Sequence, residues 1–252
     1  MKAFVIGLSG IEKSYTSAME VVKQLQQYGH AAEFFDGVPG NEAVVRAQQE
    51  GREPYPYSIK STAVTADELQ NWIRPELYDE FVERHFWKII QRHPLDDWIE
   101  KVKMPGVIGC FYSHLTLWRK CLELNEPIMI FEDDIKIYRN YEPVEWNDVL
   151  ILGLGKTAYL KDPYKQYLES PVRRAKAVPY PYSSMPGTCG YAITPHAASK
   201  LIKFYKKYYC PSDNAIHKFV CEIECHTHLM GRHKSEEEGN VSMTRTKEWR
   251  CE

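Results

Sequence analysis

The sequence lacks any long uninterrupted hydrophobic run, and it lacks an excess of charge of one sign. No segment approaches the roughly 18–20 consecutive apolar residues that a membrane-spanning helix needs. The 32 basic and 34 acidic residues are mixed along the chain and give a formal net charge of −2. Because no basic stripe is present, nucleic acid is not the expected partner. We expect no membrane span, although peripheral contact with a membrane stays open.

The chain also lacks paired cysteine spacing. Its seven cysteines are odd in number, and none of them forms a Cys-x-x-Cys pair. Free thiols in a reducing compartment are therefore the simplest interpretation. The apolar run at residues 3–8 is too short for a signal peptide and fits a buried strand better. From these features we expect a cytoplasmic protein.

What the sequence does contain is enough apolar material for a folded core. Hydrophobic residues make up 44% of the chain and aromatic residues 13%, which argues against general disorder. A chain of 252 residues can hold one large domain with an insertion. We expect one domain over residues 1–235, with a helical insertion at 40–105, and a polar tail at 236–252.

The first 37 residues have the pattern of a strand, a helix and a strand. Residues 2–8 and 31–35 predict short buried strands, and between them apolar residues recur at helical spacing up to Gly29, a candidate helix cap. Two strands joined by a helix predict a right-handed unit with parallel strands. Within the insertion, Pro75 can open a helix that His93-Pro94 would end.

The second half of the chain continues the alternation. A helix is predicted to start near Ser113 and to end at Asn125, because apolar residues there follow helical spacing. Another helix is expected after Thr194-Pro195. Buried strands are predicted at 127–131, 148–154 and 189–193. The expected fold class is α/β, with a mostly parallel central sheet flanked by helices.

Three consecutive acids, Glu132, Asp133 and Asp134, directly follow the apolar residues 128–131. In parallel α/β sheets, ligands sit at the carboxyl ends of the strands. Alternation along an extended backbone directs Glu132 and Asp134 to one side and Asp133 elsewhere. Two convergent carboxylates suit Mg²⁺ or Mn²⁺, which would cancel their repulsion and bind a diphosphate. The alternative is a solvated acidic turn that ends a strand.

The segment GVIGCFYSHLTLWRKCLELNEPIMIFEDDIKI, residues 106–137, resembles the central block of glycosyltransferase family 25. That family includes lipopolysaccharide galactosyltransferases and collagen galactosyltransferase domains. Further segments that resemble the family occur in the expected order: FVIGL (4–8), FFDG (34–37), NDVLILG (147–153), GTCGYAITPHAASKLI (187–202) and PSDNAI (211–216). Two features depart from it: Glu12-Lys13-Ser14 stands where the family often has an arginine, and residues 40–100 have no counterpart.

The resemblance implies a single GT-A-like domain that binds a nucleotide sugar. It implies transfer of a sugar, galactose in the first instance, from a UDP-sugar donor to a hydroxyl of a glycan or another acceptor. Inversion at the anomeric carbon and a Mn²⁺ or Mg²⁺ ion are expected. In this scheme Asp134 binds the metal with help from Glu132, and Asp133 meets the ribose or the sugar of the donor.

Two further roles are assigned on the same basis. Asp213 is the predicted catalytic base, although an Asx turn or a helix cap explains it equally well, and Asp148 is held in reserve. Alternate residues of the segment 221–229 share one face if it is extended, and His228 is chosen over His226 as a further metal ligand.

The expected substrate-binding residues lie at the ends of the predicted strands and in the glycine-rich block. For Gly187 and Gly190 the reason is that glycine lets a backbone approach a sugar closely, and an ordinary turn is the alternative. His114 and Tyr191 have structural alternatives, a hydrogen bond to a loop and a place in the core. The full set is Leu8, Lys13, Asp36, Gly37, His114, Asp133, Gly187, Thr188, Gly190 and Tyr191.

Two other functions compete with sugar transfer. A metal-dependent sugar nucleotidyltransferase also uses paired carboxylates and a nucleotide, and a non-catalytic nucleotide-sugar-binding module is the third reading. The segment GLGKT at 153–157 resembles the end of a P-loop, but Leu150 stands where the first glycine is required. ATP hydrolysis is therefore not expected.

Overall fold

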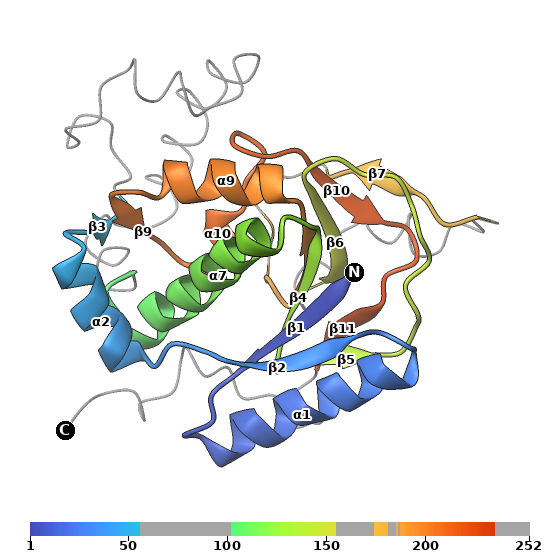
Figure 1. Cartoon of the computed structure of the whole chain (residues 1–252), viewed down its shortest axis with the longest axis horizontal. Coiled ribbons are helices and arrows are strands. Elements are labelled where there is room, and N and C mark those ends of the chain that lie inside the picture. The colour runs from blue at the N-terminus through green and yellow to red at the C-terminus, as the bar shows by residue number, and fades with distance from the viewer. Residues whose placement is uncertain (56–101, 155–173, 181–184, 186, 235–252) are drawn as a thin grey trace.

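A nine-stranded mixed sheet lies at the centre of the protein in its computed structural model (Figure 1). The structure describes residues 1–55, 102–154, 174–180, 185 and 187–234. Among these residues, no helix has both the length and the hydrophobicity that crossing a bilayer requires. The strand order along the main path is β2-β1-β4-β8-β6-β10-β7.

The amino-terminal unit agrees with the predicted pattern. Strand β1 (Lys2–Gly7) is followed by helix α1 (Glu12–Gln27) and by strand β2 (Ala32–Asp36). The two strands pair in parallel, with Ala3 opposite Ala32. Gly29 follows the helix with a φ of +82°, a conformation that glycine adopts without strain. The prediction of a helix end at this glycine is confirmed.

The centre of the sheet differs from the prediction because one strand runs backwards. Strand β4 (Ile128–Glu132) pairs in parallel with β1, but β8 (Gly190–Ile193) is antiparallel to both β4 and β6 (Val149–Leu154). The sheet is therefore mixed, and the expected mostly parallel sheet is not confirmed. The reason is that a short apolar run buried on both faces shows the same pattern in either direction.

On the far side of β6, the last two described strands, β10 and β11, join the sheet together with β7 and β5. Strand β10 (Ile223–His226) pairs in parallel with β6 and antiparallel with β7 (Ala177–Pro179). Strand β11 (Gly231–His233) pairs in parallel with β6 and antiparallel with β5 (Ile135–Ile137). β11 therefore lies directly beside β5, the strand that follows the three acids.

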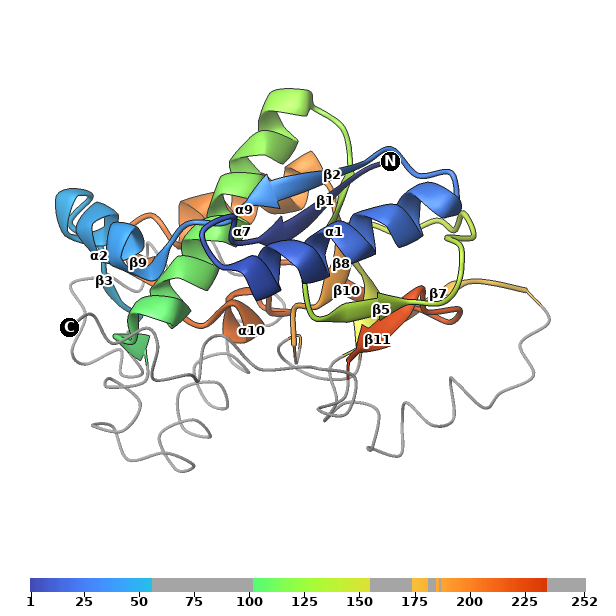
Figure 2. The ribbon, with the colours of Figure 1, turned by 90° about the horizontal axis from the view of Figure 1, so that it is seen from below.

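Helices cover both faces of the sheet (Figure 2). Side chains at alternate positions of β1 and β4 point to opposite faces: Phe4 and Ile130 belong to the core under α7 (Pro105–Leu124) and α9 (Pro195–Phe204). Val5 and Met129 belong to the core under α1. This alternation, which follows from the extended backbone, gives the protein two apolar layers with the sheet between them.

Helix α7 starts earlier than predicted. It begins at Pro105. Proline suits the first helical position because an N–H there would have no partner within the helix, and proline has no N–H. The prediction of a start near Ser113 is therefore wrong. Ser113 lies inside the helix, where its hydroxyl donates to the Gly109 carbonyl at 2.8 Å and accepts the Val38 N–H at 2.9 Å. Asn125 ends the helix in the left-handed conformation with a φ of 51°, as predicted.

The predicted insertion is described only in part. It opens with helix α2 (Gly40–Gln49), followed by the short strand β3 (Glu53–Pro54), which pairs with β9 (Tyr208–Tyr209). The helix predicted after Pro75 and the polar tail at 236–252 lie outside the described residues. A last short helix, α10 (Ser212–Ala215), carries Asp213.

Candidate active site

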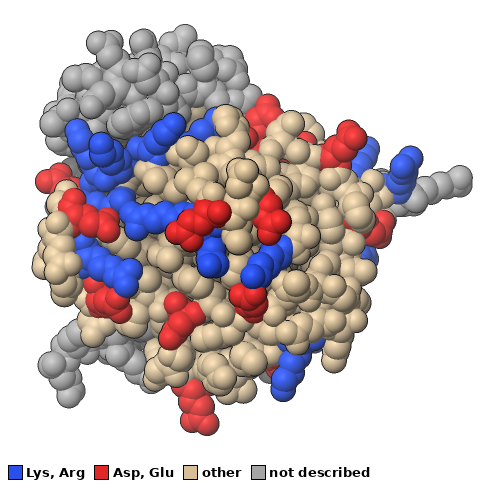
Figure 3. Space-filling view, in the orientation of Figure 1, with Lys and Arg blue, Asp and Glu red and all other residues tan. Residues whose placement is uncertain are grey.

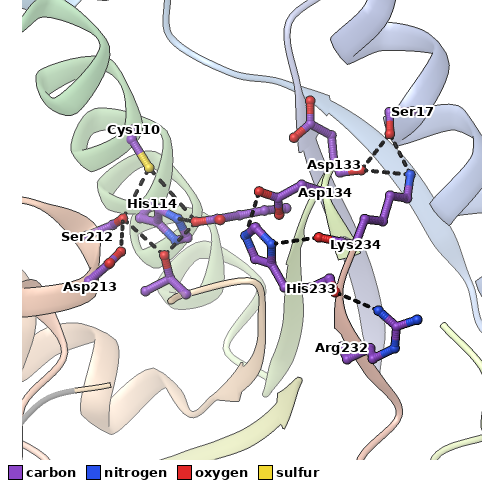
Figure 4. Close-up of polar contacts among 12 residues, drawn as sticks. Ser17, Cys110, His114, Asp133, Asp134, Ser212, Asp213, Arg232, His233 and Lys234 are labelled. Atoms are coloured by element: carbon purple, nitrogen blue, oxygen red, sulfur yellow. Dashed lines mark hydrogen bonds and ion pairs between the residues drawn. The ribbon is translucent and has the colours of Figure 1, made fainter. Parts of the chain in front are cut away.

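The three acids Glu132, Asp133 and Asp134, called the acidic turn below, lie where β4 ends and β5 begins. Figure 4 shows Cys110, His114, Ser212 and Asp213 on one side of this turn and His233 and Lys234 on the other. The sheet order places β4 between β1 and β8, so the turn projects from the middle of the sheet. Each of its carboxylates has its own set of partners.

Glu132 is held by two side-chain hydrogen-bond donors. Its Oε1 accepts from Nε2 of His114 at 3.1 Å and from the hydroxyl of Thr188 at 2.5 Å. Burial raises the pKa of the Glu132 carboxyl, but the hydrogen bonds from these two side chains outweigh that effect and hold the pKa below its ordinary value. Glu132 is therefore ionised at neutral pH.

His114 is oriented from behind by a second buried contact. Its Nδ1 lies 2.9 Å from the hydroxyl of Tyr191, and that hydroxyl accepts from the indole N–H of Trp118 at 2.9 Å. His114, Tyr191 and Trp118 have no exposed surface. Tyr191 therefore lies in the core, and the hydrogen bonds of His114 go to Tyr191 on β8 and to Glu132 at the end of β4 rather than to a loop.

Asp133 points toward α1. Its Oδ2 accepts from the hydroxyl of Ser14, which in turn accepts the backbone N–H of Leu8 at 3.0 Å. Burial and the neighbouring Asp134 raise the pKa of the Asp133 carboxyl to about 7, although the Ser14 hydrogen bond opposes the shift. Ser14 thus joins the acidic turn to the loop that follows β1.

Asp134 pairs with a histidine that the sequence analysis did not name. Its Oδ2 lies 2.8 Å from Nε2 of His233, and Nδ1 of His233 lies 3.3 Å from the Lys234 carbonyl. A carbonyl only accepts, so Nδ1 carries a proton. Although burial lowers the pKa of His233, the contact with Asp134 raises it to about 9. The other carboxylate oxygen, Oδ1, is buried and has no hydrogen-bond partner among the described residues.

Lys234 fixes the backbone of the acidic turn. Its N–H donates to the Asp134 carbonyl at 2.7 Å, and its ammonium donates to the Ser17 hydroxyl at 2.6 Å and to the Asp133 carbonyl at 3.3 Å. Arg232 lies in register with Lys136, whereas His233 and Lys234, the next two residues, contact the acidic turn. The positive charge of these three consecutive residues is the sequence signal that could have identified His233 and Lys234.

The residue after the acidic turn, Ile135, is seated among three glycines. A Cβ added to Gly153, Gly190 or Gly231 would lie 2.6, 2.9 or 2.9 Å from the Ile135 Cδ1 atom. Gly190 was predicted to let backbone approach a sugar; here the space above its Cα is filled by Ile135 and the ring of Phe131. The three glycines together make room for the side chain that anchors β5.

Asp213 lies on the Glu132 side of the site. Ser212 contacts the Thr188 hydroxyl at 3.0 Å, the Cys110 sulfur at 3.1 Å and Oδ1 of Asp213 at 3.5 Å. Asp213 itself is exposed. The structure therefore brings the predicted base to the same cluster as Glu132, although the two residues are 81 positions apart in the sequence.

A set of potential metal ligands also occurs in this cluster. One ligand atom each from Cys110, His114 and Glu132 lies within 4.8 Å of the others. Burial and the nearby Glu132 raise the pKa of the Cys110 thiol well above its ordinary value, so the sulfur keeps its proton. The contact between His114 and Glu132 is a hydrogen bond, and we interpret the cluster as a hydrogen-bond network.

The predicted residues at the ends of β1 and β2 lie near each other. Asp36 accepts from the Ser9 N–H at 2.9 Å and from the Ser9 hydroxyl at 2.5 Å. The Gly37 N–H donates to the Gly7 carbonyl at 2.7 Å, so Asp36 and Gly37 hold the loop that contains Leu8. Lys13 is exposed in the first turn of α1.

Other predicted residues lie in different surroundings. His228 pairs with Glu142 through Nδ1 at 2.8 Å, and His226 contacts the Glu142 carbonyl at 2.8 Å. Asp148, the reserve base, is buried at the amino end of β6, where it accepts from Lys200 at 3.0 Å. Gly187 adopts a φ of +67°, which explains a glycine at that turn.

Comparison with known proteins connects this arrangement to a family. Residues 1–216 match the family described as Glycosyltransferase family 25 (LPS biosynthesis protein). The lipooligosaccharide biosynthesis protein lex-1 of Haemophilus influenzae is 30% identical over 128 residues. That alignment covers 46% of this chain and 41% of lex-1, so it spans less than half of either protein. His233 and Lys234 lie beyond the part of the chain that matches the family.

Proposed function

The chain belongs to glycosyltransferase family 25, and on that premise we propose that it transfers galactose from UDP-galactose to a hydroxyl of a glycan acceptor, with inversion and with a divalent metal. The observation that carries the proposal is the acidic turn, which lies at the carboxyl end of β4. The ends of β1 and β2 lie at the same edge of the sheet, because these three strands are parallel neighbours. This is where open α/β sheets bind nucleotides.

The chemistry of the Asp134 environment fits a metal ion. Asp134 offers a buried carboxylate oxygen without a hydrogen-bond partner among the described residues, and His233 lies beside the other oxygen, where its Nε2 would bind a metal after giving up the proton that it donates to Asp134. Carboxylate oxygen and imidazole nitrogen together suit Mn²⁺. We assign the metal to Asp134 and His233, the latter in place of His228. When bound, such an ion would offset the charge of the departing diphosphate.

The remaining roles follow from where the side chains lie. Asp133 and Ser14 connect the acidic turn to the loop at Leu8, which suits contact with the nucleotide or its ribose. The exposed Lys13 in the first turn of α1 is placed to add positive charge to phosphate oxygens. Asp213 is the proposed base that takes the proton of the acceptor hydroxyl, since it is an exposed carboxylate beside the Glu132 cluster. This arrangement agrees with the nucleotide-sugar site of a GT-A-like fold.

The metal assignment is tested by titrating UDP into the protein with Mn²⁺ in a calorimeter. We expect Asp134→Ala and His233→Ala each to weaken Mn²⁺-dependent UDP binding at least about tenfold, the size of effect usual for groups that hold a metal. His228→Ala is the matched control and should bind UDP as the unaltered protein does.

Turnover is followed in parallel as metal-dependent release of UDP from UDP-galactose, which chelation with EDTA should abolish. Release of pyrophosphate from UTP and galactose 1-phosphate, with no release of UDP from UDP-galactose, would indicate a nucleotidyltransferase. Equal loss of UDP binding in His228→Ala, with full binding in His233→Ala, would refute the choice of histidine.

A further inference from the structure

Glu132 is the end point of two buried chains of hydrogen-bond donors. Both groups of contacts reach the same atom, Oε1: one comes from His114, which Tyr191 on β8 contacts, and the other from Thr188, which lies beside Ser212 on α10. The direction of each bond follows from the chemistry of the groups.

The first chain starts at Trp118, whose indole nitrogen can only donate. It donates to the hydroxyl oxygen of Tyr191, so the single proton of that hydroxyl is available for Nδ1 of His114. Nδ1 then accepts, which leaves the His114 proton on Nε2, where it is donated to Glu132 at 3.1 Å. The order Trp118, Tyr191, His114 thus sets the tautomer of the histidine that contacts Glu132.

The second chain ends in the hydroxyl of Thr188. An ionised carboxylate only accepts, so the one proton of this hydroxyl is donated to Glu132 at 2.5 Å. The Thr188 hydroxyl also lies 3.0 Å from the Ser212 hydroxyl, and Ser212 donates to Oδ1 of Asp213 at 3.5 Å. The thiol of Cys110 lies 3.1 Å from the Ser212 hydroxyl and donates to Oε1 of Glu132 at 3.9 Å.

Within the part of the chain that the structure describes, these contacts all reach Oε1 and leave Oε2 for a ligand. The Glu132 side chain keeps 20% of its surface exposed, although its His114 partner keeps 1%. The carboxylates of the acidic turn differ in their partners, since Asp134 pairs with His233 and Glu132 accepts from His114 and Thr188. A carboxylate fixed through one oxygen presents the other as a directed hydrogen-bond acceptor, which suits a sugar hydroxyl.

We propose that Thr188, His114 and Tyr191 are positioning residues that fix Glu132 through Oε1, so that Oε2 accepts a hydrogen bond from a hydroxyl of the donor hexose. The proposal rests on the proposed function, which places the diphosphate at Asp134, two residues away. The hexose and the ribose are bonded to opposite ends of that diphosphate, and the proposed function places the ribose on the Asp133 side, so the hexose is the sugar beside Glu132. In this arrangement Glu132 recognises the sugar, whereas Asp134 and His233 hold the metal.

The test compares the binding of UDP with that of UDP-galactose, both with Mn²⁺, in the full chain. Thr188→Val keeps the side-chain shape but removes the hydroxyl, and Tyr191→Phe removes the hydroxyl that orients His114. Both variants should bind UDP within about threefold of the unaltered protein. Both should lose at least about tenfold in UDP-galactose affinity and in UDP-galactose hydrolysis, as expected for a lost hydrogen bond to a charged group.

Two further variants separate this role from a structural one. Thr188→Ser restores the hydroxyl and should recover most of the UDP-galactose affinity. Thr116→Val makes the same change on α7, where the Thr116 hydroxyl donates only to the Tyr112 carbonyl, and should leave both affinities unchanged. Thermal melts of every variant show which changes come from unfolding.

Unchanged preference for UDP-galactose in both Thr188→Val and Tyr191→Phe would overturn the proposal. An equal loss of UDP and UDP-galactose affinity would also overturn it, because Glu132 would then belong with the metal ligands. Failure of the unaltered protein to bind UDP with Mn²⁺ would refute the proposed function as well, and that outcome is visible before any variant is made.

Discussion

At the scale of single residues, the three adjacent carboxylates of the acidic turn coexist because they do not share partners. Two like charges 4 Å apart repel by about 4 kcal/mol at an effective dielectric constant of about 20. His114 and Thr188 donate to Glu132, Ser14 donates to Asp133, and the cationic His233 stabilises Asp134. Under the proposed function, these separate partners let one turn serve a metal, a nucleotide and a sugar.

Asp213 gives a prediction at this scale. Asp213→Asn keeps the size of the side chain but removes its basicity, so UDP binding with Mn²⁺ should stay within about threefold while transfer falls roughly 10²–10⁴-fold, the usual contribution of a general base. Transfer is measured from UDP-galactose to an acceptor identified on a glycan array.

Asp148→Asn serves as the comparison because Asp148 is a buried carboxylate at the opposite end of the sheet. It accepts from Lys200 and from the Glu222 N–H, both at 3.0 Å, so its replacement should lower the melting temperature but leave kcat unchanged below that temperature. Unchanged transfer by Asp213→Asn would remove Asp213 as the base.

At the scale of elements, the position of the acidic turn depends on the packing of β5. The turn is too short to hold itself, and β5 has only three residues. Ile135 anchors it, since the side chain is fully buried and reaches the glycines of three other strands, β6, β8 and β11. Protein interiors are packed so closely that one added methyl group at such a point lowers the stability of the fold.

Gly153 offers a direct test of this anchor. In Gly153→Ala the new methyl group would lie 2.6 Å from Ile135 Cδ1, so we expect a loss of about 1–3 kcal/mol in the free energy of unfolding, typical of overpacking. Ile135→Val removes Cδ1, so the double variant should be more stable than Gly153→Ala alone.

Chemical denaturation measures these differences. Gly10→Ala is the control, because an added Cβ there has no neighbour within 4 Å, and its stability should change by less than about 0.5 kcal/mol. If the double variant is no more stable than Gly153→Ala, the steric clash of the new methyl group is not with Ile135.

At the scale of the whole molecule, the fold is closed by a segment that lies beyond the family match. The match ends at residue 216, but β10 and β11 follow it and pair with β5, β6 and β7. The same segment brings His233 and Lys234 to the acidic turn. On the face seen in Figure 3, positively and negatively charged side chains lie side by side. Lys and Arg gather on the side of α9, and Lys203, Lys206 and Lys207, at the end of that helix and just after it, are exposed.

A chain ending at residue 216 should therefore not fold cooperatively. Without β10 and β11, the backbone of β6 loses its partners on one side and the apolar face of the sheet loses its cover, so both polar and apolar groups would be exposed. Thermal melts followed by circular dichroism compare this fragment with the full chain. A cooperative melt of the fragment would contradict the prediction.

The sequence by itself determined the elements and the chemistry available to them. Its periodicity predicted β1, α1, β2, β4, β6, β8 and α9, and the three acids after four apolar residues identified the acidic turn. The motifs also indicated the family. Local patterns carry this information because burial on one face or both faces is written into neighbouring residues.

Only the tertiary structure decided which of these residues meet. It set the reversed direction of β8, the pairing of His233 with Asp134 about a hundred residues away, and the buried chains from Trp118 and Cys110 to Glu132. Contacts of this kind depend on the order and direction of strands in the sheet. An apolar run records that it is buried but not which strand lies beside it.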